Sequence, residues 1–269
     1  MSGREADPAF RDLLGYLSDI GYGDLYLSAS ARNSDPSSAG ARPAVSQSGP
    51  PTVSTAAPAA QESAAPRIAR AAPADLAARV AELKEIEQRV SVCTRCRLSE
   101  GRTRTVFGAG NPAAELMFIG EGPGAEEDKQ GLPFVGRAGE LLNRIIQAID
   151  FSREEVYIAN VVKCRPPGNR DPQPDEVIAC RGYLERQVEL IQPRILVALG
   201  RIAAQTLLGN QDPIGRMRGR WFKVLGVPTM VTYHPAALLR NPALKRPTWE
   251  DMQLVRDRLR EEPGGGTPP

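Results

Sequence analysis

The sequence predicts an α/β fold in which a mainly parallel sheet is covered by helices on both faces. Short apolar runs typical of buried strands alternate, over residues 73–262, with longer segments whose apolar residues recur at helical spacing. Strands that alternate with helices in this way indicate a parallel sheet between helical layers. In such sheets, ligands bind beyond the carboxyl ends of the strands, so the loops at that edge are the expected functional region.

The first expected elements are a helix, a strand and a second helix. Asp75 is expected to cap a helix that runs to about Val92 and carries apolar residues on one face. Residues 115–120 form an apolar run that predicts a buried strand. Residues 139–149 place leucines and isoleucines at helical spacing, which predicts a helix.

The same alternation continues toward the carboxyl terminus. Residues 156–162 and 194–200 are apolar runs that predict two more strands, and residues 174–191 predict the helix between them. The remaining expected elements are a short helix at 202–208, strands at 221–225 and 227–233, and a closing helix at 248–260.

The regions on either side of this domain have a different composition. Residues 8–20 carry apolar residues at helical spacing and predict a short amphipathic helix. Residues 29–74 consist mainly of Ala, Ser, Pro and Gly, which bury too little apolar surface to fold, so residues 1–72 are expected to be a largely disordered extension. This extension is either a solvated tail or a tether whose helix docks a protein partner. Residues 263–269 are expected to be a disordered tail.

Composition narrows the class of function. The formal net charge is +2, which permits nucleic-acid binding without requiring it. The sequence has no apolar run long enough to cross a membrane and no secretory signal, so a cytoplasmic protein is expected. In a reducing compartment cysteines more often bind metal than form disulfides. Either an iron–sulfur cluster or a structural zinc could use the four thiols, which are Cys93, Cys96, Cys164 and Cys180.

The first expected strand-end loop spans residues 120–128 and is rich in glycine and acidic residues. It lacks the Gly-Lys-Ser/Thr ending of a phosphate-binding loop, and its acidic residues would repel phosphates. Glu121 lies among the glycines at the strand end, where a carboxylate can position a water or face a developing positive charge. The alternative is a purely structural turn.

Two further strand-end loops carry polar side chains. Asn160 can read an amide-like edge with its donor and acceptor, or it can cap its own turn. His234 is the only histidine, and it either packs structurally or donates an N–H to a leaving anion. Phe134 either stacks on a flat ring or belongs to the core. Leu238, beside Leu239 and Arg240, either inserts into a base stack or belongs to a short core-facing helix turn.

Basic residues recur near these loops and could contact phosphates, although scattered charges are usually a solvated face. They are Arg137, Lys163, Arg165, Arg170, Arg216, Arg218, Arg220, Lys223, Arg240, Lys245 and Arg246.

Taken together, these features resemble a known family. From about Val92 to Leu259 the chain is similar to the family 4 uracil-DNA glycosylases, the iron–sulfur type found in bacteria and archaea. The resemblance rests on motifs that occur in this order, namely Cys93–Cys96, Gly120–Asp128, Pro133–Gly136, Asn160–Pro167, Cys180 and His234–Arg240.

The resemblance implies a three-layer α/β/α sandwich with a short parallel sheet. It also implies that the four cysteines hold a structural [4Fe–4S] cluster. It implies a substrate site in which uracil lies against Phe134, Asn160 binds its Watson–Crick edge and Gly120 and Gly122 line the base. His234 would bond near O2 and Glu121 would handle water, so these two are the expected catalytic residues. Leu238 would fill the space that the flipped nucleotide leaves.

The resemblance further implies an enzyme that releases uracil from single- or double-stranded DNA by hydrolysis, leaving an abasic site, and acts as a monomer. Relatives that trap the sugar covalently carry a histidine that residues 165–174 lack, so turnover is expected. Family 5 relatives lack a carboxylate at the position of Glu121, which favours family 4. A non-catalytic, polymerase-associated DNA-binding module is the alternative function.

Overall fold

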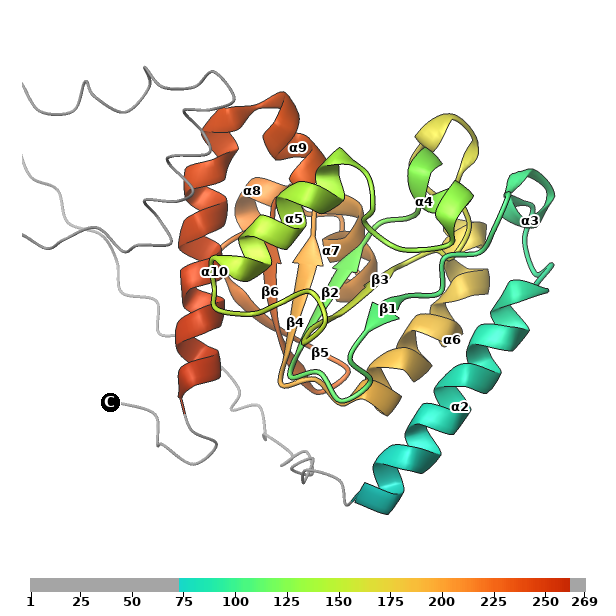
Figure 1. The fold of residues 1–269 in the computed structure, drawn as a ribbon. Helices are drawn as coiled ribbons and strands as arrows, with labels where there is room; N and C mark the ends of the chain where they lie inside the picture. Colours follow the sequence, from blue (N-terminus) through green and yellow to red (C-terminus); the bar gives the residue numbers. More distant parts are fainter. Residues whose placement is uncertain (1–72, 262–269) are drawn as a thin grey trace, which may run out of the picture. The chain divides into compact units, whose positions relative to one another are not determined.

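The computed structural model describes residues 73–261, which form a six-stranded sheet flanked by helices (Figure 1). The strand order is β1-β3-β2-β4-β6-β5. The strands are β1 (Ala109–Gly110), β2 (Leu116–Gly120), β3 (Tyr157–Asn160), β4 (Ile195–Leu199), β5 (Trp221–Val224) and β6 (Val227–Thr232). The helix expected at 8–20, the disorder expected over 29–74 and the tail at 263–269 lie outside the described residues.

The sheet is mainly parallel, as predicted. Its central strands β3, β2, β4 and β6 run parallel, and β1 and β5 pair antiparallel at the two edges. The four parallel strands are buried along nearly their whole length, which explains why they read as continuous apolar runs in the sequence. Their carboxyl ends therefore meet at one edge of the sheet and bring together loops from distant parts of the chain.

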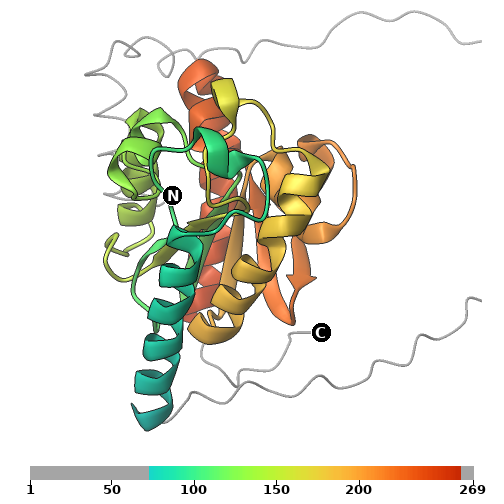
Figure 2. The ribbon, with the colours of Figure 1, turned by 90° about the vertical axis from the view of Figure 1, so that its right-hand side faces the viewer.

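The helices form two layers, one on each face of the sheet. They are α2 (Pro73–Ser91), α3 (Leu98–Gly101), α4 (Ala125–Gln130), α5 (Arg137–Gln147), α6 (Pro174–Ile191), α7 (Arg201–Leu208), α8 (Ile214–Met217), α9 (Pro235–Arg240) and α10 (Lys245–Arg260). Figure 2 shows α5 on one side of the sheet and α7 on the other.

Alternation along the strands assigns the core residues to the two layers. Met117 and Ile119 of β2 point to the face that packs against α2, α6 and α7, where they share a core cluster with Ile86 and Leu184. Phe118, which lies between them, points to the opposite face and is fully buried. The predicted α/β/α sandwich is thus confirmed.

Several element boundaries differ from the sequence prediction. Helix α2 begins at Pro73, so Asp75 is not its cap but lies in the first turn, 3.7 Å from Arg79. Strand β3 ends at Asn160 rather than at residue 162, although the next amide, Val161 N–H, still donates to the Gly120 carbonyl. Residues 235–240, expected as a loop, form helix α9, because Pro235 suits the first helical turn and His234 caps it.

Candidate functional site

A cavity of about 510 Å³ opens at the carboxyl ends of the parallel strands. Glu121 follows β2, Asn160 ends β3, Gly200 follows β4 and His234 follows β6, and all four line this cavity. The structure therefore brings together the polar residues of the three loops that the sequence singled out. Gly122 and Phe134 also line the cavity, whereas Gly120 lies directly behind Asn160 and Phe134.

Asn160 presents an unsatisfied acceptor in this cavity. Its side chain is only 2% exposed, and its Oδ1 has no hydrogen-bond partner among the described residues. A Cβ at Gly120 would lie 2.4 Å from that oxygen and 2.7 Å from Cζ of Phe134, so only glycine leaves room for this packing. Because an unpaired buried polar group costs about 1–3 kcal/mol, Asn160 is poised for a ligand with a complementary donor.

Phe134 provides a flat face next to His234. The two ring centroids are 5.5 Å apart, with the planes tilted by 30°. The backbone of Phe134 is left-handed, with φ of 52°, which is uncommon for a bulky residue. Gly139 permits this turn, because a Cβ there would clash with the Phe134 carbonyl oxygen at 1.9 Å. Phe134 is buried, as expected of a core residue, and it also lines the cavity; its stacking on a flat ring stays a prediction.

Glu127 holds the turn that carries Phe134, a role that the sequence reasoning missed. Its Oε1 accepts the N–H groups of Val135 and Gly136 at 3.0 and 3.1 Å, and its Oε2 accepts that of Gly124 at 3.1 Å. One carboxylate thus joins the glycine-rich loop to the Phe134 turn. The acidic run was read only as repelling phosphate, but a Glu three residues after a loop glycine is also the signal of a helix cap.

His234 is held as a neutral ring with a defined tautomer. Its Nδ1 accepts the backbone N–H of Ala236 at 3.1 Å, so the ring proton resides on Nε2. Burial, with a smaller contribution from Arg240, lowers the pKa of His234 to about 4. Gly200, with φ of 90°, lets the backbone approach, since a Cβ there would lie 2.8 Å from that of His234. The site therefore offers a neutral N–H donor.

Glu121 has the opposite shift. Burial, reinforced by the charge of Asp171 and opposed by that of Arg201, raises its pKa to about 7. Asp171 and Arg201 line the same cavity and form an ion pair with 2.6 Å between Oδ2 and Nη2. Neither residue was predicted at the site. For Arg201 a signal was present, because it directly follows a glycine at the end of a predicted strand.

The structure corrects the prediction for Leu238. Its side chain is 2% exposed and packs inside the domain, so it is not placed to insert into DNA. The physical reason is the helical turn of α9, which directs Leu238 inward and leaves Leu239 half-buried beside the exposed Arg240. Two of the expected phosphate-contacting residues are likewise buried, Lys163 at 1% and Lys245 at 8% exposure.

The four cysteines line one small cavity together with Lys163, Arg102 and Tyr183. The Sγ of Cys164 accepts an N–H of Arg102, and the Sγ of Cys180 accepts the backbone N–H of Lys163, each at 3.3 Å. Burial raises the pKa of Cys164 to about 11, and burial also raises the pKa of Cys180 above its ordinary value. Within residues 73–261, no three His, Cys, Asp or Glu side chains are arranged as ligands of a metal ion.

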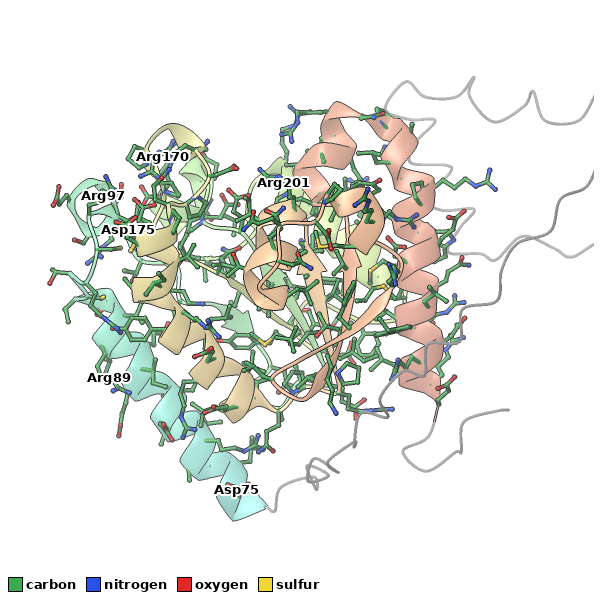
Figure 3. The ribbon with its side chains drawn as sticks, turned by 180° about the vertical axis from the view of Figure 1, so that it is seen from behind. Asp75, Arg89, Arg97, Arg170, Asp175 and Arg201 are labelled. Atoms are coloured by element: carbon green, nitrogen blue, oxygen red, sulfur yellow. The ribbon has the colours of Figure 1, made fainter. Side chains whose placement is uncertain are left out.

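Ion pairs fix the cysteine loop to the start of α6. Arg97, which follows Cys96, lies 3.3 Å from Asp175 and 3.3 Å from the fully buried Glu176. Arg170 makes a second, bidentate pair with Glu176 at 2.6 and 2.9 Å. Figure 3 shows Arg97, Arg170 and Asp175 gathered at the same end of the molecule as Arg201. The segment before α6 contributes to both cavities, because Cys164 lines the cysteine cavity and Arg170 and Asp171 line the large cavity.

Comparison with known proteins places this geometry in a family. The family model described as the uracil DNA glycosylase superfamily matches residues 107–253, more than half of the chain. The chain belongs to the uracil-DNA glycosylase superfamily. Within it, the chain is 45% identical to a type-4 uracil-DNA glycosylase of Sulfurisphaera tokodaii, over 65% of this chain and 84% of the relative.

Two other type-4 uracil-DNA glycosylases match similarly. The enzyme of Saccharolobus solfataricus is 46% identical over 66% of this chain and 87% of its own length. That of Thermotoga maritima is 45% identical over 67% of this chain and 97% of its own length. The resemblance to type-4 uracil-DNA glycosylases is thereby confirmed. No helix in the described part of this superfamily member is both long and apolar enough to span a membrane.

Proposed function

We propose that the protein is a uracil-DNA glycosylase that flips deoxyuridine out of DNA, hydrolyses its N-glycosidic bond and leaves an abasic site for base excision repair. One observation carries this proposal beyond family membership. The cavity holds a buried Asn160 oxygen that has no partner within residues 73–261, next to the flat ring of Phe134 and a neutral imidazole. That set of groups suits a flat base with an N–H and carbonyl groups on its edge.

Uracil is read by the groups around Asn160. The Asn160 Oδ1 accepts the N3–H of uracil and the Asn160 amide N–H donates to O4, while the Phe134 ring stacks on the base. Cytosine presents an unprotonated N3 and an amino group at these positions, so it would leave the Asn160 amide mismatched. The backbone of Gly122, which faces the cavity, completes the contacts to the base.

Glu121 and His234 perform the cleavage. The bond between C1′ and N1 breaks, its electron pair leaves with uracil, and positive charge grows on the sugar. The carboxylate of Glu121 faces that charge and takes a proton from the water that adds to C1′. The Nε2–H of His234 donates a hydrogen bond to O2 of the leaving uracil anion. This bond stabilises the anion while the proton stays on His234. Because residues 165–174 contain no histidine, the sugar is not trapped and the enzyme turns over.

The residues around the cysteine cavity fit an iron–sulfur cluster by their chemistry. All four cysteines of the chain line the one cavity, and Arg102 and Lys163 supply N–H donors to two of the sulfurs. Four thiolates in one cavity could hold either a zinc ion or a cluster, and the resemblance to the family 4 uracil-DNA glycosylases, the iron–sulfur type, favours the cluster. We therefore propose a [4Fe–4S] cluster with a structural role on Cys93, Cys96, Cys164 and Cys180.

The DNA lies across the mouth of the large cavity. Arg240 is exposed beside the half-buried Leu239, so we assign Leu239, in place of Leu238, to the space that the flipped nucleotide leaves. The substrate is uracil-containing DNA, single- or double-stranded, and the protein acts as a monomer in the cytoplasm. A docking partner for the helix expected at 8–20 completes the proposed interactions.

Release of free uracil from a uracil-containing oligonucleotide by the purified full chain tests this function. We expect release with wild-type protein and loss of activity, on the order of 10²–10³ in rate, with His234→Ala. A Lys129→Gln variant, altered at an exposed surface position, serves as the control. Absence of release from wild-type protein on single-stranded, U·G and U·A substrates would instead favour the non-catalytic DNA-binding module.

A further inference from the structure

Lys163 is among the largest fully buried side chains of the domain, at 1% exposure. Removing an ammonium group from water costs several kcal/mol unless it is hydrogen-bonded. Here Nζ donates to the backbone carbonyl of Asn160 at 2.8 Å and to Oε1 of Gln187 at 2.5 Å. It also lies 5.9 Å from the ring centroid of Phe107. A charged group held this deeply, with its acceptors provided, indicates a specific role.

The contacts of Lys163 reach both cavities. Its backbone N–H donates to Sγ of Cys180 at 3.3 Å, so the residue begins at the cysteine cavity. Its side chain then turns back three residues and ends on the backbone carbonyl of Asn160, a residue that lines the large cavity. Gln187, the second acceptor, lies on α6, the helix that also carries Cys180.

The partners of Lys163 are themselves fixed. Gln187 Nε2 donates to the Phe107 carbonyl at 2.9 Å and to the Tyr157 hydroxyl at 3.3 Å. The Lys163 carbonyl accepts the N–H of Val106 at 2.7 Å. The ammonium is therefore anchored from several elements, and its position determines where the Asn160 carbonyl can lie.

We propose that Lys163 is a positioning residue that sets the orientation of Asn160 for reading uracil and joins it to the cysteine cavity. The inference rests on the proposed function and deepens it. In the described part of the chain, no hydrogen bond fixes the side-chain oxygen of Asn160. Its orientation depends on packing against Gly120 and on its backbone, which Lys163 holds by the carbonyl.

The connection also explains how a cysteine site that touches no substrate can affect base recognition. A displacement of Cys180, or of residues 163–164, moves the Lys163 backbone. The Lys163 side chain then transmits that movement to Asn160. Arg102 provides a contrast, because it donates to Cys164 and to the carbonyl of Cys93 but to nothing at the large cavity.

A double-mutant cycle tests this role. Wild type, Lys163→Met, Asn160→Ala and the double variant are compared by single-turnover uracil excision and by inhibition with free uracil. Since a hydrogen bond to a charged group is at stake, we expect Lys163→Met to weaken both by about tenfold. In the Asn160→Ala background, the same change should have less than about a twofold further effect. Methionine keeps the length of the stem and removes only the charged donors.

Iron content and visible absorption are measured for every variant. Arg79→Met is the matched control, because Arg79 is a largely buried cation that donates to the Leu190 carbonyl at 2.6 Å and lines neither cavity. We expect it to leave uracil inhibition unchanged per iron-containing molecule. Full additivity of Lys163→Met with Asn160→Ala, or unchanged uracil inhibition in Lys163→Met, would overturn the proposal. If Lys163→Met does not fold, Gln187→Met is measured in its place. We expect this variant to weaken inhibition by free uracil about threefold, again non-additively with Asn160→Ala. Unchanged inhibition in Gln187→Met would overturn the proposal. Failure of the proposed function differs, because wild type itself would then release no uracil.

Discussion

The pKa of Glu121 gives a prediction that can be followed across pH. Burial raises this pKa to about 7, and the proposed reaction requires the carboxylate. At one pH unit below the pKa only about a tenth of the molecules carry it, so excision should slow about tenfold per unit below pH 7. Above about pH 8 the rate should level off. The decline in rate below pH 7 is the acid limb of the pH–rate profile. His234 adds no second limb in this range, because its pKa is about 4.

Asp171→Asn should move this limb to lower pH. Asp171 raises the pKa of Glu121, while its partner Arg201 lowers it. Removing the Asp171 charge eliminates the first effect and frees the guanidinium from its 2.6 Å ion pair, so both consequences favour the Glu121 carboxylate. Below pH 7 the variant should therefore be faster than wild type. Because both partners are about half exposed, we expect a modest shift.

The assay is single-turnover uracil excision from a short oligonucleotide with enzyme in excess, measured from pH 5 to 9 at constant ionic strength. Asp150→Asn is the matched control, since Asp150 also forms a 2.6 Å ion pair, with Arg260, and does not line the large cavity. Glu121→Gln should bind DNA, cleave slowly and lose the limb. A limb that persists in Glu121→Gln, or one that Asp171→Asn leaves in place, would refute the reasoning.

Three other substitutions separate the roles of neighbouring residues. Leu238→Ala should lower the free energy of unfolding by about 2–5 kcal/mol, measured by urea denaturation, because it empties a core position. Leu239→Ala should leave stability nearly unchanged but reduce excision from double-stranded more than from single-stranded DNA; equal loss on both would contradict its proposed insertion. Glu127→Gln should raise KM for uracil-containing DNA, because its carboxylate no longer accepts three backbone N–H groups around Phe134. An unchanged KM in steady-state kinetics would argue against that role.

Much of the fold could be predicted from the sequence because its strands and helices differ in period. The four parallel strands are buried on both faces and appear as uninterrupted apolar runs. Helix α6 was predicted at residues 174–191 because Pro174 suits the first helical turn and the apolar residues after it recur at helical spacing. Some short elements were missed. Helix α4 is only six residues long, too short to show a period, and β1 pairs through two residues.

The site was predictable where position along a strand mattered and not where side-chain direction mattered. Glu121, Asn160 and His234 each follow or end a parallel strand, so a common edge was expected and is observed. By contrast, no sequence pattern decides between base-stack insertion and a core-facing turn for Leu238, and none reveals that Lys163 turns back beneath Asn160. Both depend on the path of the chain after its strand ends, which packing with distant elements decides.

The two catalytic candidates are perturbed by one physical cause. Burial raises the pKa of the Glu121 carboxyl and lowers that of the His234 imidazole, so in each case it favours the uncharged form. A cavity with this property disfavours isolated charge, yet cleavage creates a positive sugar and a negative base. The growing sugar charge favours ionised Glu121, and the Nε2–H of His234 faces the base. The same exclusion of water that shifts the two pKa values therefore strengthens both interactions as the bond breaks.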